Sequence, residues 1–361
     1  MHNKELIFAV GPVEMDKNIL DLGSNQPPYF RTDDFSRLIL ENESILKKLL
    51  YADEKSKVLF LTASGTGAMD ATISNLFNEK DKVLIINGGS FGNRFKEICD
   101  FYNINNEQIK LNQGQKLLKN HLEGYKNKGF TSLLVNVHET STGVLYDMPI
   151  ITEFCEQNNL LLVVDAISSF LADEYTMSKW NIDVTILSSQ KALALPPGIS
   201  MVALSERALE KLETCTSKSY YFNFKDYIKN GERGQTPYTP AVSILIQLNQ
   251  KLKDIETLGV SHYIDNCKIL AEHFRKGIKN LPFEIPSESL SNAVTPLKPL
   301  GKMKAHDIFE YIKENYNIYL CPNGGEFRDT LFRVGHIGNL SIKDNEKLLK
   351  IFNDMYKGDL I

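Results

Sequence analysis

The chain has 361 residues, 42% of them hydrophobic and 24% charged, with 41 basic and 45 acidic residues and a formal net charge of −4. This is the composition of a globular protein large enough for two or three domains, and its even mixture of charges excludes the strongly basic surface typical of proteins that bind nucleic acids or anionic membranes. No apolar run is long enough to span a bilayer, and the opening segment MHNKELIFAV is too short and too acidic for a signal peptide.

Apolar runs alternate with amphipathic stretches over residues 57–204. Runs that are apolar throughout are typical of buried strands, and the stretches between them, 67–77, 91–102 and 148–159, have the spacing of helices. This alternation predicts a mainly parallel sheet that is covered by helices on both faces. The six apolar runs are KVLFLTA (57–63), KVLIIN (82–87), SLLVNV (132–137), LLLVVDA (160–166), DVTILSS (183–189) and ISMVAL (199–204).

The pattern changes after residue 204. An aromatic stretch, 217–227, leads into the turn-rich GERGQTPYTP (231–240), and a long helical pattern follows over 241–259. The remaining residues are typical of a smaller α/β unit. We therefore expect three parts: an N-terminal arm (1–20), a large domain (21–255) and a small C-terminal domain (256–361).

Ligands of an open α/β sheet gather beyond the carboxyl ends of its strands. After the first run, Ser64, Gly65, Thr66 and Gly67 permit a tight turn whose backbone N–H groups open a helix, which suits a phosphate. A strand–helix turn without any ligand is the alternative. The missing GK[ST] excludes a P-loop.

The next strand exits carry an aromatic ring, hydroxyls and a carboxylate. Phe91, in NGGSFGNR, could cover a flat ligand ring, although core packing also explains a phenylalanine there. Thr140, Ser141 and Thr142 supply hydroxyls that equally suit caps or turns. Asp165 ends an apolar strand, where a carboxylate needs either a partner that offsets its desolvation or a helix to cap.

A lysine completes the series. Lys191, in SSQKALALPPG, follows the strand 183–189, where desolvation would favour its neutral and nucleophilic amine. A surface lysine just past a strand end is the other interpretation. Taken together, a phosphate cradle, a flat wall, hydroxyls, a carboxylate and an amine are the groups that pyridoxal phosphate requires, because its aldehyde condenses with a lysine and a carboxylate keeps its pyridine nitrogen protonated.

With these residues, the chain resembles the class V, fold-type-I pyridoxal-phosphate aminotransferases, especially the alanine/serine–glyoxylate and 2-aminoethylphosphonate–pyruvate group. The resemblance implies an α/β fold with a large domain built on a mainly parallel seven-stranded sheet and a smaller C-terminal α/β domain. The matching segments run in the family's order along nearly the whole chain: GPV (11–13), SGTGAMDA (64–71), NGGSFGNR (87–94), HETSTGVL (138–145), VVDAISS (163–169), SSQKALALPPG (188–198) and FRVGHIG (332–338).

The resemblance also implies roles for the residues around the cofactor ring. Lys191 would form the Schiff base and shuttle protons, and Asp165 would pair with the pyridine nitrogen. Ile167 and Phe91 would pack on opposite faces of the ring, and Thr140 or Ser141 would bond the ring hydroxyl. The implied phosphate ligands are Ser64, Gly65, Thr66 and Gln190 of one subunit, with Gln235, Thr236 and Thr239 as candidates from the partner subunit of a homodimer with shared active sites.

Arg333 would hold the substrate carboxylate through a bidentate fork, with a structural ion pair as the alternative. Two departures from the family pattern stand out. The turn NGGSFGNR is one residue longer than usual, which affects the register of Phe91, and Phe30 stands where a histidine is common at the active-site entrance. We expect His336 to be a loop residue and not a base.

The resulting hypothesis is an aminotransferase that moves an amino group from a small donor (alanine, serine or 2-aminoethylphosphonate) to pyruvate or glyoxylate by a ping-pong mechanism. No second, obviously placed arginine suits a dicarboxylate. One alternative is a lyase of the same fold, such as a cysteine desulfurase that uses Cys321, and another is a non-catalytic homologue, which would need neither Lys191 nor Asp165. The five widely spaced cysteines, without a CxxC or a Cys/His cluster, favour a reducing cytoplasm and no disulfide framework or metal site.

Overall fold

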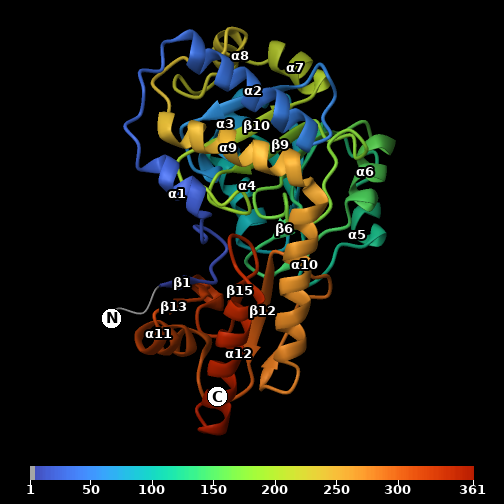
Figure 1. Ribbon diagram of the computed structural model, residues 1–361. Coiled ribbons are helices and arrows are strands. Elements are labelled where there is room, and N and C mark those ends of the chain that lie inside the picture. The colour runs from blue at the N-terminus through green and yellow to red at the C-terminus, as the bar shows by residue number, and fades with distance from the viewer. Residues whose placement is uncertain (1–4) are drawn as a thin grey trace.

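The computed structural model describes residues 5–361, and its centre is a seven-stranded sheet (Figure 1). The strands lie in the order β2-β10-β9-β8-β5-β3-β4, and only β10 runs antiparallel to its neighbours. The mainly parallel seven-stranded sheet is therefore confirmed. The strands are β2 (Lys57–Leu61), β3 (Lys82–Asn87), β4 (Asn105–Lys110), β5 (Ser132–Asn136), β8 (Leu161–Asp165), β9 (Val184–Ser188) and β10 (Ser200–Leu204).

Helices cover both faces of this sheet because its strands bury side chains on both sides. Along β2, Val58 and Phe60 join one hydrophobic core while Leu59 and Leu61 join the other, as the alternation of a strand requires. The first core lies under α2 (Asp33–Leu49), α6 (Met148–Gln157) and α9 (Val242–Leu258). The second lies under α3 (Gly65–Leu76), α4 (Ser90–Phe101), α7 (Glu206–Glu213) and α8 (Phe224–Gly231).

A smaller α/β unit with its own hydrophobic core occupies the lower part of Figure 1. Its antiparallel sheet has the order β11-β12-β15-β14 and packs with α10, α11 and α12. Its elements are α10 (Val260–Gly277), β11 (Phe283–Glu284), β12 (Val294–Pro299), α11 (Ala305–Tyr316), β13 (Ile318–Tyr319), β14 (Cys321–Pro322), a 3-10 turn (Gly325–Phe327), β15 (Phe332–Gly335) and α12 (Ile342–Lys357).

The segment before the large domain contacts both units. Strand β1 (Leu6–Ile7) pairs in parallel with β13, whereas α1 (Lys17–Gly23) packs against α9. The predicted helical stretch 241–259 is observed as α9, and it ends at Gly259, whose φ of +87° breaks the helix before α10 begins. The division into an arm and two domains remains a prediction, and the helix break lies slightly beyond the expected boundary.

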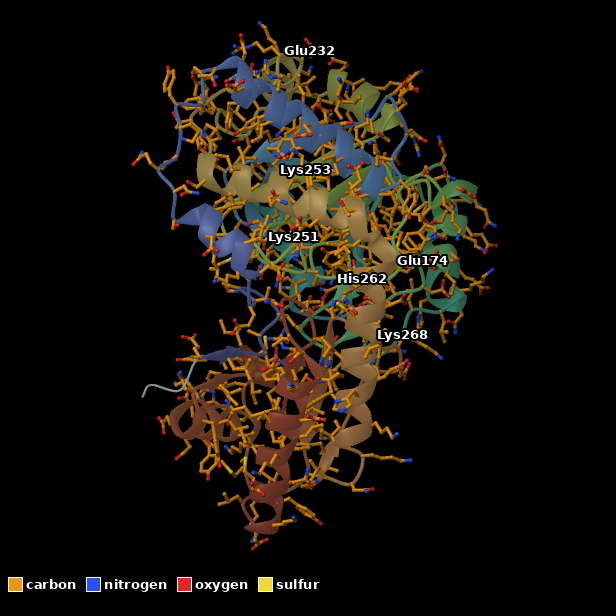
Figure 2. All side chains as sticks on the ribbon, viewed as in Figure 1. Glu174, Glu232, Lys251, Lys253, His262 and Lys268 are labelled. Atoms are coloured by element: carbon orange, nitrogen blue, oxygen red, sulfur yellow. The ribbon has the colours of Figure 1, made fainter. Side chains whose placement is uncertain are left out.

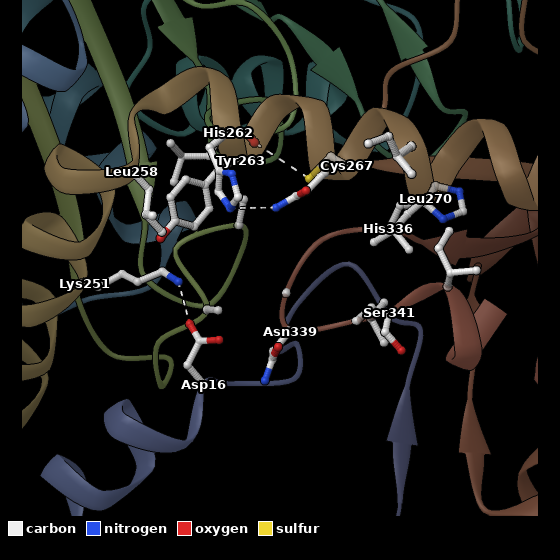
Figure 3. Close-up of a pocket in the computed structure, with 18 residues that line it drawn as sticks. Asp16, Lys251, Leu258, His262, Tyr263, Cys267, Leu270, His336, Asn339 and Ser341 are labelled. Atoms are coloured by element: carbon white, nitrogen blue, oxygen red, sulfur yellow. Dashed lines mark hydrogen bonds and ion pairs between the residues drawn. The ribbon is translucent and has the colours of Figure 1, made fainter.

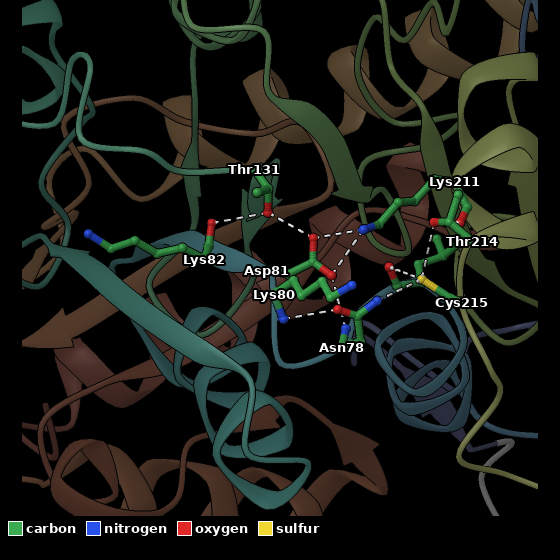
Figure 4. A network of polar contacts seen from close by, with 9 residues as sticks. Asn78, Lys80, Asp81, Lys82, Thr131, Lys211, Thr214 and Cys215 are labelled. Atoms are coloured by element: carbon green, nitrogen blue, oxygen red, sulfur yellow. Dashed lines mark hydrogen bonds and ion pairs between the residues drawn. The ribbon is translucent and has the colours of Figure 1, made fainter.

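The amino ends of the central strands are closed by a polar network (Figure 4). The buried carboxylate of Asp81, just before β3, accepts hydrogen bonds from Lys211 Nζ at 2.8 and 3.0 Å, from Thr131 Oγ1 at 3.0 Å and from the backbone N–H of Asn78 at 2.9 Å. Every acceptor oxygen of this carboxylate is engaged. The network therefore stabilises this end of the sheet.

Charged side chains of both signs stand out from the two units, Lys253 and Glu232 of the large unit among them (Figure 2). Some of them pair across the surface, as Lys253 does with Glu41 at 2.8 Å. None of the helices within residues 5–361 combines the length and the apolar character needed to cross a membrane.

Candidate active site

The carboxyl ends of the central strands surround one cavity. Nine of the predicted site residues line it, drawn from the ends of five different strands or the turns that follow them, and Met69, Arg94 and Ser168 complete the lining. The sheet thus brings together residues that are far apart in the sequence. The predicted residues are Ser64, Gly65, Thr66, Phe91, Thr140, Asp165, Ile167, Gln190 and Lys191.

Lys191 follows β9 and is packed from behind by the N-terminal segment. A Cβ atom at Gly11 would lie 2.8 Å from Lys191 Cδ, so only glycine lets the backbone pass this close to the lysine stem. Burial lowers the pKa of the Lys191 amine, and the nearby charge of Arg333 acts in the same direction, against the opposing effect of Cys321. Both effects shift the amine toward its neutral, nucleophilic form.

Asp165 ends β8, the neighbouring strand, and is buried at the same cavity. Burial raises the pKa of its carboxyl to about 7, although the N–H of Ile167 donates to Oδ1 at 2.8 Å and the Lys191 charge lies nearby. A carboxylate at this position is therefore short of positive charge. A cationic ring nitrogen in the cavity would supply it.

The first turn of α3 forms the predicted cradle. Ser64 caps the helix by accepting the Gly67 N–H at 3.3 Å, and the turn opens onto the cavity. A Cβ at Gly65 would lie 2.4 Å from Ile167 Cδ1, so a side chain there would displace the residue expected on the ring face. Beside the cradle, Gln190 Oε1 accepts a hydrogen bond from Ser188 Oγ at 2.6 Å.

The register of Phe91 is settled by Glu139. The buried Glu139 carboxylate accepts the N–H groups of Phe91 at 3.2 Å and Gly92 at 3.0 Å, and so caps the first turn of α4. A Cβ at Gly89 would lie 2.6 Å from Glu139 Cδ, so the lengthened turn is packed tightly against this carboxylate. Phe91 lines the cavity in spite of the extra residue.

The two candidate hydroxyls lie differently in the turn between β6 (His138–Glu139) and β7 (Val144–Leu145). Ser141 Oγ donates to Glu139 at 2.5 Å and accepts the Ser90 N–H at 3.0 Å, so it is engaged away from the cavity. Thr140 lines the cavity and shares a hydrogen bond of 2.6 Å with Ser168 Oγ. The geometry favours Thr140 for the role that the sequence left open between them.

Arg333 comes from β15 of the small unit and reaches toward this turn. Its side chain is buried, with Nη1 donating to Thr140 O at 2.9 Å and Nη2 to Pro322 O at 2.7 Å. Within residues 5–361 it forms no ion pair, and its buried Nε has no hydrogen-bond partner. A guanidinium has five N–H groups, so the remaining donors can still bind an anion.

The loop expected to reach a partner subunit has mixed exposure. Gln235 is buried, donates to Ser36 Oγ at 2.7 Å and accepts from Arg31 Nη1 at 3.1 Å. Thr236 is also buried, with its hydroxyl on Tyr238 O at 2.7 Å, whereas Thr239 is exposed. Thr239 is the candidate of the three whose side chain is accessible to a second chain.

A larger cleft of about 390 Å³ lies between α10 and the residues after Lys191 (Figure 3). Lys251 lines this cleft, and its ammonium is 2.6 Å from Asp16 Oδ2 and 4.9 Å from the ring centroid of Tyr263. The charges of Lys251 and Asp16 therefore offset each other. His336 also borders this cleft, shares a 2.7 Å hydrogen bond with Thr295, and is buried, which lowers its pKa well below the usual value. The lining of this cleft does not combine a phosphate cradle, a flat apolar wall and a carboxylate, as the cavity at the strand ends does.

Four residues at or beside the cavity were not among those expected from the sequence: Met69, Arg94 and Ser168 of its lining, and Glu139, which caps α4. Arg94 and Glu139 stand inside the motifs NGGSFGNR and HETSTGVL. The signal that could have found Arg94 is its spacing of three residues from Phe91, which places both on one face of a helix.

The family described as Aminotransferase class-V matches residues 29–325. The chain is 30% identical over 351 residues to a protein named soluble hydrogenase, small subunit, from Synechococcus sp., an alignment covering 95% of this chain and 91% of that protein. It is 27% identical over 347 residues to serine–glyoxylate aminotransferase of Arabidopsis thaliana, covering 93% and 86%. In fold it matches an aspartate aminotransferase of Thermus thermophilus with a TM-score of 0.91 at 23% identity, covering 99% of this chain and 100% of that one.

Proposed function

The chain belongs to the class V aminotransferases, and we propose that it moves an amino group from a small donor (alanine, serine or 2-aminoethylphosphonate) to pyruvate or glyoxylate by a ping-pong mechanism. One observation carries the proposal: the amine of Lys191 and the carboxylate of Asp165 border the same cavity at the ends of neighbouring strands. The glyoxylate aminotransferases among the relatives support this choice of acceptor.

The residues present fit pyridoxal phosphate. The cavity has the Asp165 carboxylate, which forms no ion pair within residues 5–361, the Lys191 amine, whose pKa is lowered by burial, and a helix N-terminus. When bound, this cofactor supplies an aldehyde that reacts with amines and a protonated ring that accepts electrons from the substrate. Asp165 would keep the ring nitrogen protonated, and Phe91 and Ile167 would hold the ring flat between them.

The remaining residues orient the reaction. Lys191 would take the proton from the donor carbon and return it to the acceptor, since its amine borders the cavity. Arg333 would hold the carboxylate of each substrate in turn with the N–H groups that it does not spend on Thr140 and Pro322. Thr140 would bond the ring hydroxyl. The groups assigned to the phosphate are Ser64, Gly65, Thr66 and Gln190, with Gln235, Thr236 and above all Thr239 as candidates from the partner subunit.

The active unit in this proposal is a cytoplasmic homodimer with shared sites. The exposed Thr239 supports it, as do the largely exposed rings of Tyr29 and Tyr220, which are typical of a surface that another chain covers. The ring of Tyr220 lies 6.0 Å from that of Tyr238, next to Thr239. Sedimentation should give a dimer, and a fully active monomer would contradict the assignment.

A single-turnover experiment tests the proposed reaction. Purified protein should be yellow, borohydride should fix the cofactor to Lys191, and small amino donors should bleach the visible band in the absence of an acceptor. Pyruvate or glyoxylate should restore it. Release of sulfide from cysteine would instead favour a desulfurase acting through Cys321, and a label on any other lysine would remove the basis of the proposal.

A further inference from the structure

Arg94 is the cation in the lining of the cavity for which the proposed function has no role. It lies on α4 three residues after Phe91, and its guanidinium carbon is 5.1 Å from the centroid of the Phe91 ring. Both side chains line the cavity. Because Glu139 caps the first turn of α4, the direction of this helix, and with it the position of Arg94, is fixed relative to the strand ends.

The guanidinium is hardly used within the chain. Its one side-chain hydrogen bond among residues 5–361 runs from Nη1 to Thr66 Oγ1 at 3.1 Å, and no carboxylate lies within ion-pair distance of it in that part of the chain. A guanidinium has five N–H groups, so four remain without an acceptor among residues 5–361. An unpaired arginine beside a cavity is typical of a site for an anion.

The charge balance of the phosphate cradle points the same way. Ser64, Gly65, Thr66 and Gln190 are all neutral, whereas a phosphate monoester carries about −1.5 to −2 charges at pH 7. The N-terminus of α3 contributes only about half a positive charge. Thr66, to which Arg94 is bonded, belongs to this cradle, so the arginine is one side chain away from the phosphate position.

We propose that Arg94 is a phosphate ligand of this site, which binds the phosphate of the cofactor through its free N–H groups and supplies the positive charge that the neutral cradle lacks. This rests on the proposed function only in taking the ligand to be pyridoxal phosphate. The alternative is that Arg94 merely packs on Phe91 and keeps its ring in place.

Binding constants for two ligands distinguish these cases. Pyridoxal phosphate and pyridoxal, which has no phosphate, are titrated into cofactor-free protein and followed by fluorescence quenching. The variants are R94Q, R94K and K96Q; the last is the matched control, since Lys96 lies on the same helix, is paired with Asp100 and does not line the cavity. Circular dichroism and thermal melts check that each variant is folded.

The R94Q variant should bind pyridoxal phosphate about ten- to a hundredfold more weakly than the wild type, which corresponds to the loss of a charge-assisted hydrogen bond. Its affinity for pyridoxal should stay within about twofold of the wild type. The affinity of R94K for pyridoxal phosphate should lie between those of R94Q and the wild type, because lysine keeps the charge but loses the planar fork. R94K replaces R94Q in the test if R94Q does not fold. K96Q should match the wild type. Unchanged pyridoxal phosphate affinity in R94Q overturns the proposal, and so does an equal loss for both ligands, which would mark a packing role through Phe91. Wild-type protein that binds neither ligand would overturn the proposed function as well.

Discussion

Arg333 Nη1 donates a hydrogen bond to the backbone oxygen of Thr140 at 2.9 Å, and this contact joins a strand of the small unit to the turn that borders the cavity of the large one. The residue proposed to anchor the substrate and the residue proposed to bond the ring hydroxyl are therefore in direct contact. A change of the arginine is expected to affect substrate binding first, since Thr140 contributes only its backbone oxygen to this bond, while its hydroxyl shares a hydrogen bond with Ser168 Oγ at the cavity.

The R333K variant tests whether Arg333 acts on substrate binding and not on cofactor binding. Lysine keeps the charge but cannot reach Thr140 and Pro322 together while presenting a fork to a carboxylate. We expect KM for both donor and acceptor to rise by about ten- to a hundredfold, with cofactor affinity unchanged. Steady-state kinetics and a cofactor titration provide the two readouts. Loss of the cofactor with substrate affinities intact would instead make Arg333 a structural residue.

Asp165 predicts a pH dependence of stability in the cofactor-free protein. Its folded pKa of about 7 lies above the value of about 3.9 expected in an unfolded chain, so over this interval the folded state binds more protons than the unfolded one. The contribution of Asp165 to stability is thus present below about pH 4 and is lost as the pH rises to about 7.

The D165N variant removes that titration. The difference in melting temperature, variant minus wild type, should grow in favour of the variant between pH 5 and pH 8, as scanning calorimetry can measure. Both proteins carry all other titrating groups, which cancel in the difference. A flat difference over this range would show that the wild-type carboxyl ionises normally. In the cofactor-loaded enzyme the same variant should turn over far more slowly, because the ring nitrogen loses its partner.

Glu139 predicts a stability effect from a residue that need not contact any ligand. In E139Q, the NH2 group would face either the N–H groups of Phe91 and Gly92 or the N–H of Ser141, so in both orientations at least one donor is left without its acceptor. We expect the free energy of unfolding to fall by about 2–4 kcal/mol in urea titrations. The matched control is E97Q on the same helix, where the exposed Glu97 accepts from Asn93 and the change should cost under about 0.5 kcal/mol. Equal effects of the two variants would argue against the capping role.

Substitution of Asp81 is expected to lower the stability of the protein without changing its turnover. D81N leaves Lys211 without its ion pair at the amino ends of the strands, and since that side of the pair is buried we expect a loss of about 3 kcal/mol. The exposed pair between Lys96 and Asp100 is the control, because D100N should cost less than about 1 kcal/mol. Turnover per folded molecule should be unchanged in both variants. A drop in turnover for D81N would show that the amino-end network extends to the active site.

The sequence could predict the parts of the site that lie directly at strand exits. Asp165 and Lys191 are recognisable because an ionisable residue that ends an apolar strand is rare and its position in the sheet follows from the strand itself. Six strands were also visible as apolar runs. The seventh, β4, lies at the sheet edge with the polar sequence NNEQIK, of which only Ile109 is buried, so its place was implied by the family resemblance alone.

What the sequence could not supply depends on distances between separate segments. The choice of Thr140 over Ser141 follows from Glu139, whose carboxylate takes up the Ser141 hydroxyl. The burial of Gln235 follows from Arg31 and Ser36, some two hundred residues earlier in the chain. Such contacts depend on tertiary packing, and they cannot be predicted from a local pattern of residue types.

The pairing of β1 with β13 has a consequence for how the chain is made. A ribosome synthesises Leu6 and Ile7 long before Ile318 and Tyr319, so β1 has no partner strand while the whole large domain is being produced. Closing so long a loop is a late and entropically costly step. The Gly11 segment that packs behind Lys191 lies between this strand and α1, so the packing behind this lysine is complete only when the two distant ends of the chain meet. Nascent chains halted before residue 318 should therefore contain a folded sheet and still lack a properly seated lysine.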